Sequence, residues 1–325
     1  MSLVIIIIVF ALIFDFLNGF HDSANSIATV VATRVLRPHQ AVAMAAFANF
    51  IAAFLFPTAV AATIGKGIID PSGVSSTTIL AGVIGASLWN IITWYTGLPI
   101  SSSHALIGGL IGAVLVRSGA QLLILPGIIK ILEFIVIAPL IGMFGAGIFT
   151  ILTARIVHKK STTTLRPFFA RMQLLSSFLY SIGHGANDAQ KTMGIISLTL
   201  FSNHLLGERF YVPTWVILSS HAAIALGTYF GGWRIVKTMG VKIIKLRPFE
   251  GFCAESSSAV TLFLTAHLGI PVSTTHVISG SIVGVGSAIN VKKVRWLTTR
   301  KIFIAWMLTI PAAMLFGGVL SLVIG

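Results

Sequence analysis

The chain has very little charge. Only 9% of its 325 residues are charged and only eight are acidic, whereas 56% are hydrophobic. A soluble domain of ordinary composition is about a quarter charged, because its surface needs charged side chains to cover it and a surface in contact with lipid does not. The mean hydropathy of +0.97 agrees with this contrast. The composition excludes a large soluble core and predicts an integral membrane protein. We expect it to be a multi-pass protein of the cell (plasma) membrane.

Cysteine is almost absent as well. The single Cys253 excludes an internal disulfide, and no spacing of Cys and His residues indicates a zinc site. Met1 is followed directly by an apolar run, without a basic segment or a small-residue cleavage site. We therefore expect residues 2–17 to form a retained helix and not a signal peptide. No bound cofactor is expected.

The charge that is present is mostly positive, with 22 basic residues and a net charge of +14. Nucleic-acid-binding proteins are often this basic, but here the basic residues cluster at the ends of apolar runs. The clusters lie at residues 34–37, 155–160, 234–247 and 292–301. Such clusters are typical of cytoplasmic loops and of contacts with anionic headgroups. Membrane lipid, and not nucleic acid, is therefore the expected partner.

Two motifs occur twice in the same order. GFHDSANS at residues 19–26 corresponds to GANDAQKT at 185–192, and the offset is 166 positions. GLPISSSH at 97–104 corresponds to GIPVSTTH at 269–276, and the offset is 172. Two motifs at nearly one offset indicate an internal duplication.

The only long polar interruption lies between the two copies. It is the basic segment 155–171, which we expect to form a loop on the cytoplasmic side. The predicted organisation is a first transmembrane repeat at 1–154, this central loop, and a second transmembrane repeat at 172–325.

The first motif supplies candidate ligands for a cation. Asp22 and Asp188 lie in apolar surroundings, where an unpaired carboxylate costs several kcal/mol. We expect the adjacent Gly19 and Gly185 to let each helix unwind and free backbone carbonyls. Carboxylate, amide and carbonyl oxygens suit a small cation. A single aspartate of this kind is explained equally well as a helix-end residue that caps its own backbone, but two copies favour a site for a small cation. The candidate cation ligands are Asp22, Asn25, Asn187, Asp188 and Glu255, with the ion at Asp22 and Asp188; the resemblance given below implies that this ion is sodium.

The second motif supplies candidate ligands for an anion. Pro99 and Pro271 should end one helical arm, and the hydroxyls that follow should begin a second, short helix. Free N–H groups, hydroxyls and the helix dipole at such a start favour an oxyanion. Serine and threonine can also simply satisfy their own backbone in membrane helices. The candidate oxyanion ligands are Ser101, Ser102, Ser103, Ser273, Thr274 and Thr275, together with Gln190 and Asn25.

Other residues near the two motifs have more than one possible role. His104 and His276 are expected to be buried hydrogen-bonding groups that orient the tips. Lys191 is a group that neutralises a carboxylate or the substrate, or one that reaches toward the membrane surface. Asp15 has Ser181 at its duplicated position, and Glu255 has Val83. Asp15 either supports the first site or is a structural group, and Glu255 binds a cation or proton or is stabilised by a helix dipole.

Together the four motif copies resemble the paired signatures of the inorganic phosphate transporter (PiT) family, over both halves of the chain. The resemblance implies an all-α integral membrane protein with two inverted repeats of transmembrane helices, with broken helices and a re-entrant helical hairpin in each half. It implies a homodimeric secondary transporter of prokaryotic type, which takes up inorganic phosphate by Na⁺ or H⁺ symport through alternating access. Residues 101–103 and 273–275 would then sit at the phosphate, and Asp22 and Asp188 with neighbouring amides at the coupling cation. His21 stands where the family usually has Asn, which leaves the stoichiometry and the choice of Na⁺ or H⁺ open.

Two other classes of function compete with a carrier. A membrane enzyme acting on phosphate esters or lipid phosphates would use the His–Asp pairs for acid–base catalysis. It predicts one asymmetric centre and an Arg-rich clamp, whereas the polar motifs here are duplicated, so no catalytic residue is expected. An anion channel could use the same donors. Sulfate or arsenate also remains open as the substrate, because hydroxyl and N–H donors bind tetrahedral oxyanions in general.

Overall fold

The computed structural model describes residues 1–241 and 243–324. Within them the chain is helical, and the only β-type contact is an isolated bridge between Ile69 and Leu123. The α-helices of the described part are α1 (Ser2–Ala32), α2 (Pro38–Ile51), α3 (Ala59–Gly67), α4 (Ser76–Thr96), α5 (Ser102–Arg117), α6 (Leu125–Val157), α7 (Thr162–Ser202), α8 (Thr214–Phe230), α9 (Trp233–Val241), α10 (Pro248–His267), α11 (Thr274–Asn290) and α12 (Trp296–Ile324).

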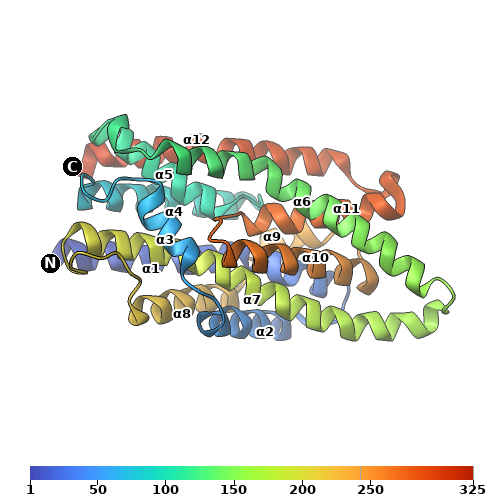
Figure 1. Cartoon of the computed structure of the whole chain (residues 1–325). Coiled ribbons are helices and arrows are strands. Elements are labelled where there is room, and N and C mark those ends of the chain that lie inside the picture. The colour runs from blue at the N-terminus through green and yellow to red at the C-terminus, as the bar shows by residue number, and fades with distance from the viewer. Residues whose placement is uncertain (242, 325) are drawn as a thin grey trace.

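The helices form an elongated bundle with both termini at one end (Figure 1). Four of them, α1, α4, α6 and α12, are long and apolar enough to cross a membrane. The stretch Pro38–Phe54 and the helix α3 form a fifth candidate span that is bent by 79°. The expectation of a multi-pass membrane protein with broken helices is confirmed.

Each half contains the predicted hairpin, made of α4 and α5 in the first half and α10 and α11 in the second. The returning arms α5 and α11 have 16 and 17 residues, which is too short to cross the hydrocarbon. The first arms end at Thr96 and His267, and the glycine in each turn has a positive φ, +68° at Gly97 and +66° at Gly269. Only glycine adopts this conformation at no steric cost, so it allows the chain to turn back.

The two halves are intertwined through these hairpins. The arm α5 packs on α12, the last helix of the other half, and α11 packs on α6 in the same way (Figure 1). Small residues allow this close approach: a Cβ atom at Gly112 would lie 2.0 Å from the carbonyl oxygen of Met314, and one at Gly284 would lie 2.0 Å from that of Met143. These glycines therefore act as helix-packing residues.

The buried apolar side chains form two large clusters with a polar layer between them. Along α1, the buried apolar residues between Val4 and Phe14 belong to the first cluster and those between Ala24 and Val30 to the second. Along α7, Tyr180 belongs to the second cluster and the buried apolar residues from Ala189 to Leu200 belong to the first. The acidic motifs lie where the two clusters meet, so the protein itself must satisfy their charges.

Helix unwinding at the acidic motifs was predicted wrongly. The helices α1 and α7 run unbroken past Gly19 and Gly185. Both glycines instead admit a neighbouring backbone: a Cβ at Gly19 would lie 2.1 Å from the carbonyl oxygen of Ile224 on α8, and one at Gly185 would lie 2.7 Å from the Cα of Asn49 on α2. Close helix packing explains these glycines, and the carbonyls beside them stay in the helical hydrogen-bond pattern.

The expected central loop at residues 155–171 is mostly helical. The helix α6 continues to Val157 and α7 begins at Thr162, so only residues 158–161 join them. The Ser161 hydroxyl accepts a hydrogen bond from the backbone N–H of Thr164 and caps α7. Basic side chains are exposed along these two helix ends. Exposed basic side chains are compatible with a helix as well as with a loop, so the sequence did not distinguish the two.

The contact between α11 and α6 provides a direct test of the intertwined packing. We expect Gly284→Ala to lower the free energy of unfolding by about 1–3 kcal/mol, because its methyl group would meet the backbone of α6. The measurement is the thermal melting temperature of the purified protein in detergent. Gly147→Ala is the matched control on the facing helix, since its Cβ would lie 3.5 Å from the nearest atom. Equal melting temperatures for the two variants would contradict the packing.

Candidate functional site

The two hairpin tips are built alike. Ser101 caps the start of α5, and its hydroxyl accepts a hydrogen bond from the backbone N–H of His104 at 3.2 Å. Ser273 begins α11 and accepts from the backbone N–H of His276 at the same distance. The hydroxyl residues that follow each cap are buried in the first helical turn. The prediction of two short helices with capped, hydroxyl-rich starts is confirmed.

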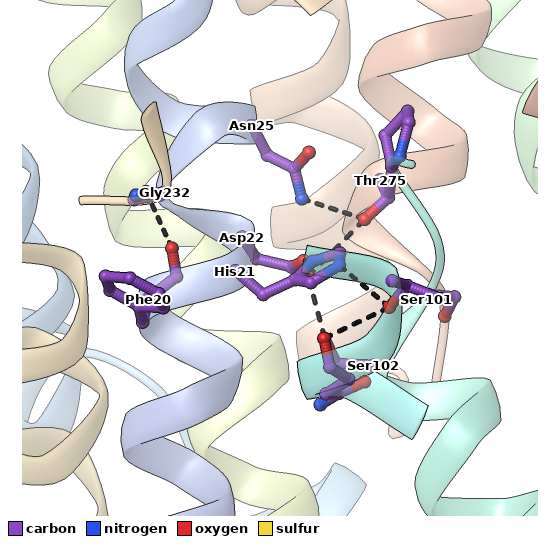
Figure 2. A network of polar contacts seen from close by, with 12 residues as sticks. Phe20, His21, Asp22, Asn25, Ser101, Ser102, Gly232 and Thr275 are labelled. Carbon is purple, nitrogen blue, oxygen red and sulfur yellow. Dashed lines mark hydrogen bonds and ion pairs between the residues drawn. The ribbon is translucent and has the colours of Figure 1, made fainter. Parts of the chain in front are cut away.

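The structure brings the two tips together. The rings of His104 and His276 lie 4.8 Å apart, and the Asp22 carboxylate accepts a hydrogen bond from one tip on each oxygen. Ser102 donates to Oδ1 and Thr275 donates to Oδ2, both at 3.4 Å (Figure 2). One carboxylate of α1 therefore lies between the hydroxyls of both halves.

Further contacts fix the tips in place. The indole N–H of Trp306 donates to the carbonyl of Pro99 at 3.0 Å, and the Tyr180 hydroxyl donates to the carbonyl of Thr274 at 3.3 Å. His276 stacks on Trp306 at 3.9 Å and contacts the carbonyl of Ile135 at 3.3 Å. These contacts agree with the expected role of this histidine in orienting its tip.

The first acidic centre lies on α1. The Nδ1 atom of His21 is 2.8 Å from Oδ1 of Asp22. One turn further on, the amide of Asn25 donates to the Thr275 hydroxyl at 2.8 Å (Figure 2). The partners of this carboxylate are therefore two hydroxyls and an imidazole.

The second acidic centre lies on α7 and contains a lysine. The Lys191 ammonium donates to the Asp188 carboxylate and to the Ser103 hydroxyl, and it donates to the carbonyl of Val272 at 2.8 Å. Thr274 donates to the same carboxylate at 2.9 Å, and Nε2 of His184 lies 3.1 Å from it. The expected neutralisation of a carboxylate by Lys191 is therefore present in the structure.

The two acidic centres lie side by side. One ligand atom each of Asp22, His184 and Asp188 falls within 4.8 Å of the others, and all three side chains are buried. Such a set, with the hydroxyls of the tips around it, can hold a small cation. It also places that cation next to the hydroxyls expected to bind the oxyanion.

Three candidate ligands are not brought to this centre. Gln190 accepts from the backbone N–H of Ala61 and donates to the carbonyl of Pro57, so its amide holds the start of α3. Asn187 donates to the carbonyl of Leu262 on α10 at 2.9 Å. Glu255 lies in a separate polar cluster and is described below. Because Asn187 and Gln190 flank Asp188 on a helix, they point to other faces of α7.

Glu255 has a polar cluster of its own. It accepts hydrogen bonds from Thr29 on α1, from Ser176 on α7 at 2.5 Å and from Gln173 on α7 at 3.2 Å. We did not identify these three partners from the sequence. The only sequence signal is the i, i+3 spacing of Gln173 and Ser176, which places both on one helix face.

Asp15 is also buried, and its polar neighbours are the side chains of Asn18 and Thr192. It lies two turns before Asp22 on α1. No contact joins these two carboxylates among the described residues, so Asp15 is not one of the groups between the tips.

Comparisons with known proteins agree with one another. Residues 18–317 match the model of the phosphate transporter family. A probable low-affinity inorganic phosphate transporter of Rhizobium meliloti is 54% identical over 95% of this chain and 92% of its own length. A protein of the same description from Bacillus subtilis is 43% identical over 98% and 96%. A solved structure described as the sodium-dependent phosphate transporter has a TM-score of 0.87 and 26% identity, and the match covers 99% of both chains. The fold, the duplicated motifs and these matches show that the chain belongs to the phosphate transporter family.

Proposed function

We propose that the protein takes up inorganic phosphate together with Na⁺, as a secondary transporter working by alternating access. It is a carrier of the plasma membrane and not an enzyme, in keeping with its family. The observation that carries the proposal is the position of Asp22, whose two carboxylate oxygens accept hydrogen bonds from the two hairpin tips. Hydroxyl donors from both halves thus converge on one point, at the N-termini of two helices.

The phosphate would be held by these donors. Ser101–Ser103 and Ser273–Thr275 supply hydroxyls, and the starts of α5 and α11 supply the positive ends of helix dipoles. Asn25 lies against one of these hydroxyls and can donate to the same ligand. The tip residues are at most 5% exposed, so the substrate reaches them only when the bundle opens toward one side.

A cation at Asp22 explains why transport would be coupled. Phosphate beside two carboxylates in a medium of low dielectric is repelled strongly. A Na⁺ ion on the Asp22 carboxylate removes this repulsion, and the phosphate in turn stabilises the ion. Each ligand therefore favours the binding of the other, which is the requirement for symport.

Two additional features belong to this proposal. Glu255 is a further cation position, apart from the phosphate, because it is a buried carboxylate with the hydroxyl oxygens of Thr29 and Ser176 beside it, while Gln173 donates to it through its amide nitrogen. The carrier needs no cofactor beyond the coupling ion, and it works as a homodimer. The mass of the detergent-purified protein, measured by light scattering, tests the dimer.

Replacement of the carboxylate between the tips tests the cation site. We expect Asp22→Asn to lower phosphate uptake driven by a Na⁺ gradient by roughly tenfold to a hundredfold, because a charged interaction contributes about 1.5–3 kcal/mol. The measurement is uptake of radiolabelled phosphate into proteoliposomes. Glu208→Gln is the matched control, since Glu208 is an exposed acid outside the site. Wild-type uptake in Asp22→Asn, or uptake that follows only a pH gradient, would reject sodium coupling at this residue.

Removal of single tip hydroxyls tests the phosphate site. We expect Ser102→Ala and Thr275→Ala each to raise the KM for phosphate by roughly threefold to tenfold, because each removes one hydrogen bond worth about 0.5–1.5 kcal/mol. Ser118→Ala, at the other end of α5, is the control and should leave KM unchanged. Sulfate is measured as a competitor in the same assay. Unchanged KM values in both tip variants would contradict the assigned phosphate site. Uptake of sulfate equal to that of phosphate would contradict its selectivity for phosphate.

A further inference from the structure

The two halves of the site differ in charge at one equivalent position. Asn25 follows Asp22 by three residues and Lys191 follows Asp188 by three, so the pairs are 166 positions apart, as the motifs are. Both side chains extend from their own helix to a hairpin tip. An uncharged amide therefore stands in the first half where the second half has an ammonium group.

The contacts preserve this equivalence. Asn25 donates to the hydroxyl of Thr275, and Lys191 donates to the hydroxyl of Ser103. Ser103 and Thr275 are themselves equivalent, because they stand 172 positions apart in the second motif. Each residue thus reaches the hairpin tip of the opposite half. The two groups differ in charge, and Lys191 in addition contacts Asp188 and Val272.

The ammonium of Lys191 is surrounded by the ligands of a cation site. Its partners are a carboxylate oxygen of Asp188, the hydroxyl oxygen of Ser103 and the carbonyl oxygen of Val272. These oxygen types are the ones that bind hard cations in proteins. An ammonium has three N–H donors, and all three have an acceptor here. The side chain is 1% exposed, so these protein oxygens take the place of the water that would otherwise hydrate the ammonium.

Among the described residues, no lysine or arginine contacts Asp22 in the way that Lys191 contacts Asp188. Asp22 accepts from two neutral hydroxyls and contacts His21. Its carboxylate is close to that of Asp188, and two buried carboxylates at this separation repel each other unless a positive charge is present. Lys191 compensates Asp188, and one negative charge remains, at Asp22.

We propose that Lys191 is a tethered cation that fills, in the second half of the site, the position that a mobile cation takes in the first half. The inference rests on the proposed function. Asp188 is then not a ligand of a transported ion, and the carrier moves one cation fewer per phosphate than its two aspartates would suggest. The ammonium also places a positive charge of the protein itself between the tips, where the phosphate binds.

The test is to make the second half like the first. Lys191→Asn leaves Asp188 without its ammonium and supplies the amide found at Asn25. We expect the number of Na⁺ ions bound per chain in the presence of phosphate to rise by about one, and the Hill coefficient for Na⁺ in phosphate uptake to rise as well, since its upper limit is the number of sites. Equilibrium binding of radioactive Na⁺ to the purified full-length protein measures the first quantity, and proteoliposome uptake measures the second. An unchanged number of bound ions in a variant that still binds phosphate overturns the proposal.

A double variant tests the proposal by a separate route, and a surface variant is its control. Asp188→Asn combined with Lys191→Met removes the ion pair without a change in net charge, and such replacements are often tolerated. We expect this double variant to bind as many Na⁺ ions as the wild type, whereas the loss of an ion would show that Asp188 held a mobile one. This result decides the proposal even where Lys191→Asn fails to fold. Lys66→Asn removes an exposed lysine and is the control for charge alone, with no expected change in the number of ions.

Failure of this inference and failure of the proposed function look different. Wild-type protein that takes up no phosphate under a Na⁺ gradient contradicts the proposed function, whatever the number of bound ions. Wild-type protein that takes up phosphate with Na⁺, but whose double variant loses a bound ion, contradicts only the role of Lys191.

Discussion

A charge inside a membrane protein has to be satisfied by the protein itself, because lipid offers neither water nor counterions. In this molecule that constraint falls on Asp22 and Asp188, which lie between two apolar clusters. The hairpin tips supply hydrogen-bond donors to these carboxylates, since each tip is the start of a helix and carries hydroxyls and free N–H groups. The rest of the bundle serves to hold these two tips against two carboxylates.

The intertwining of the halves follows from the shortness of the hairpin arms. A helix of 16 or 17 residues cannot cross the hydrocarbon by itself, so it must be covered by longer helices. The arm α5 lies against α12 and α11 against α6, so each half supplies the support for the other half's tip. This exchange explains why the tips meet in the middle of the molecule and why a glycine lies at each crossing.

A duplicated fold does not require a duplicated charge. The positions of Asn25 and Lys191 are equivalent in sequence, and each side chain donates to the equivalent hydroxyl of the opposite hairpin tip, yet one group is neutral and the other is positive. The difference matters because the electrostatic cost of bringing phosphate to this place depends on the sum of the nearby charges. Charge asymmetry within a symmetric scaffold thus lets a single substitution change the ion requirement while the helices stay as they are.

The sequence by itself determined the membrane class, the duplication and the two hairpin tips, because proline, serine and apolar length act within a few residues of one another. It also pointed to Asp22 and Asp188. Local signals could not tell whether Gly19 and Gly185 unwind a helix or admit a neighbour, because glycine permits both. Nor could they tell that Gln190 binds the start of α3 or that Lys191 reaches Ser103 and Val272. Only the tertiary structure decided these partners, because each contact joins segments that lie far apart in the chain.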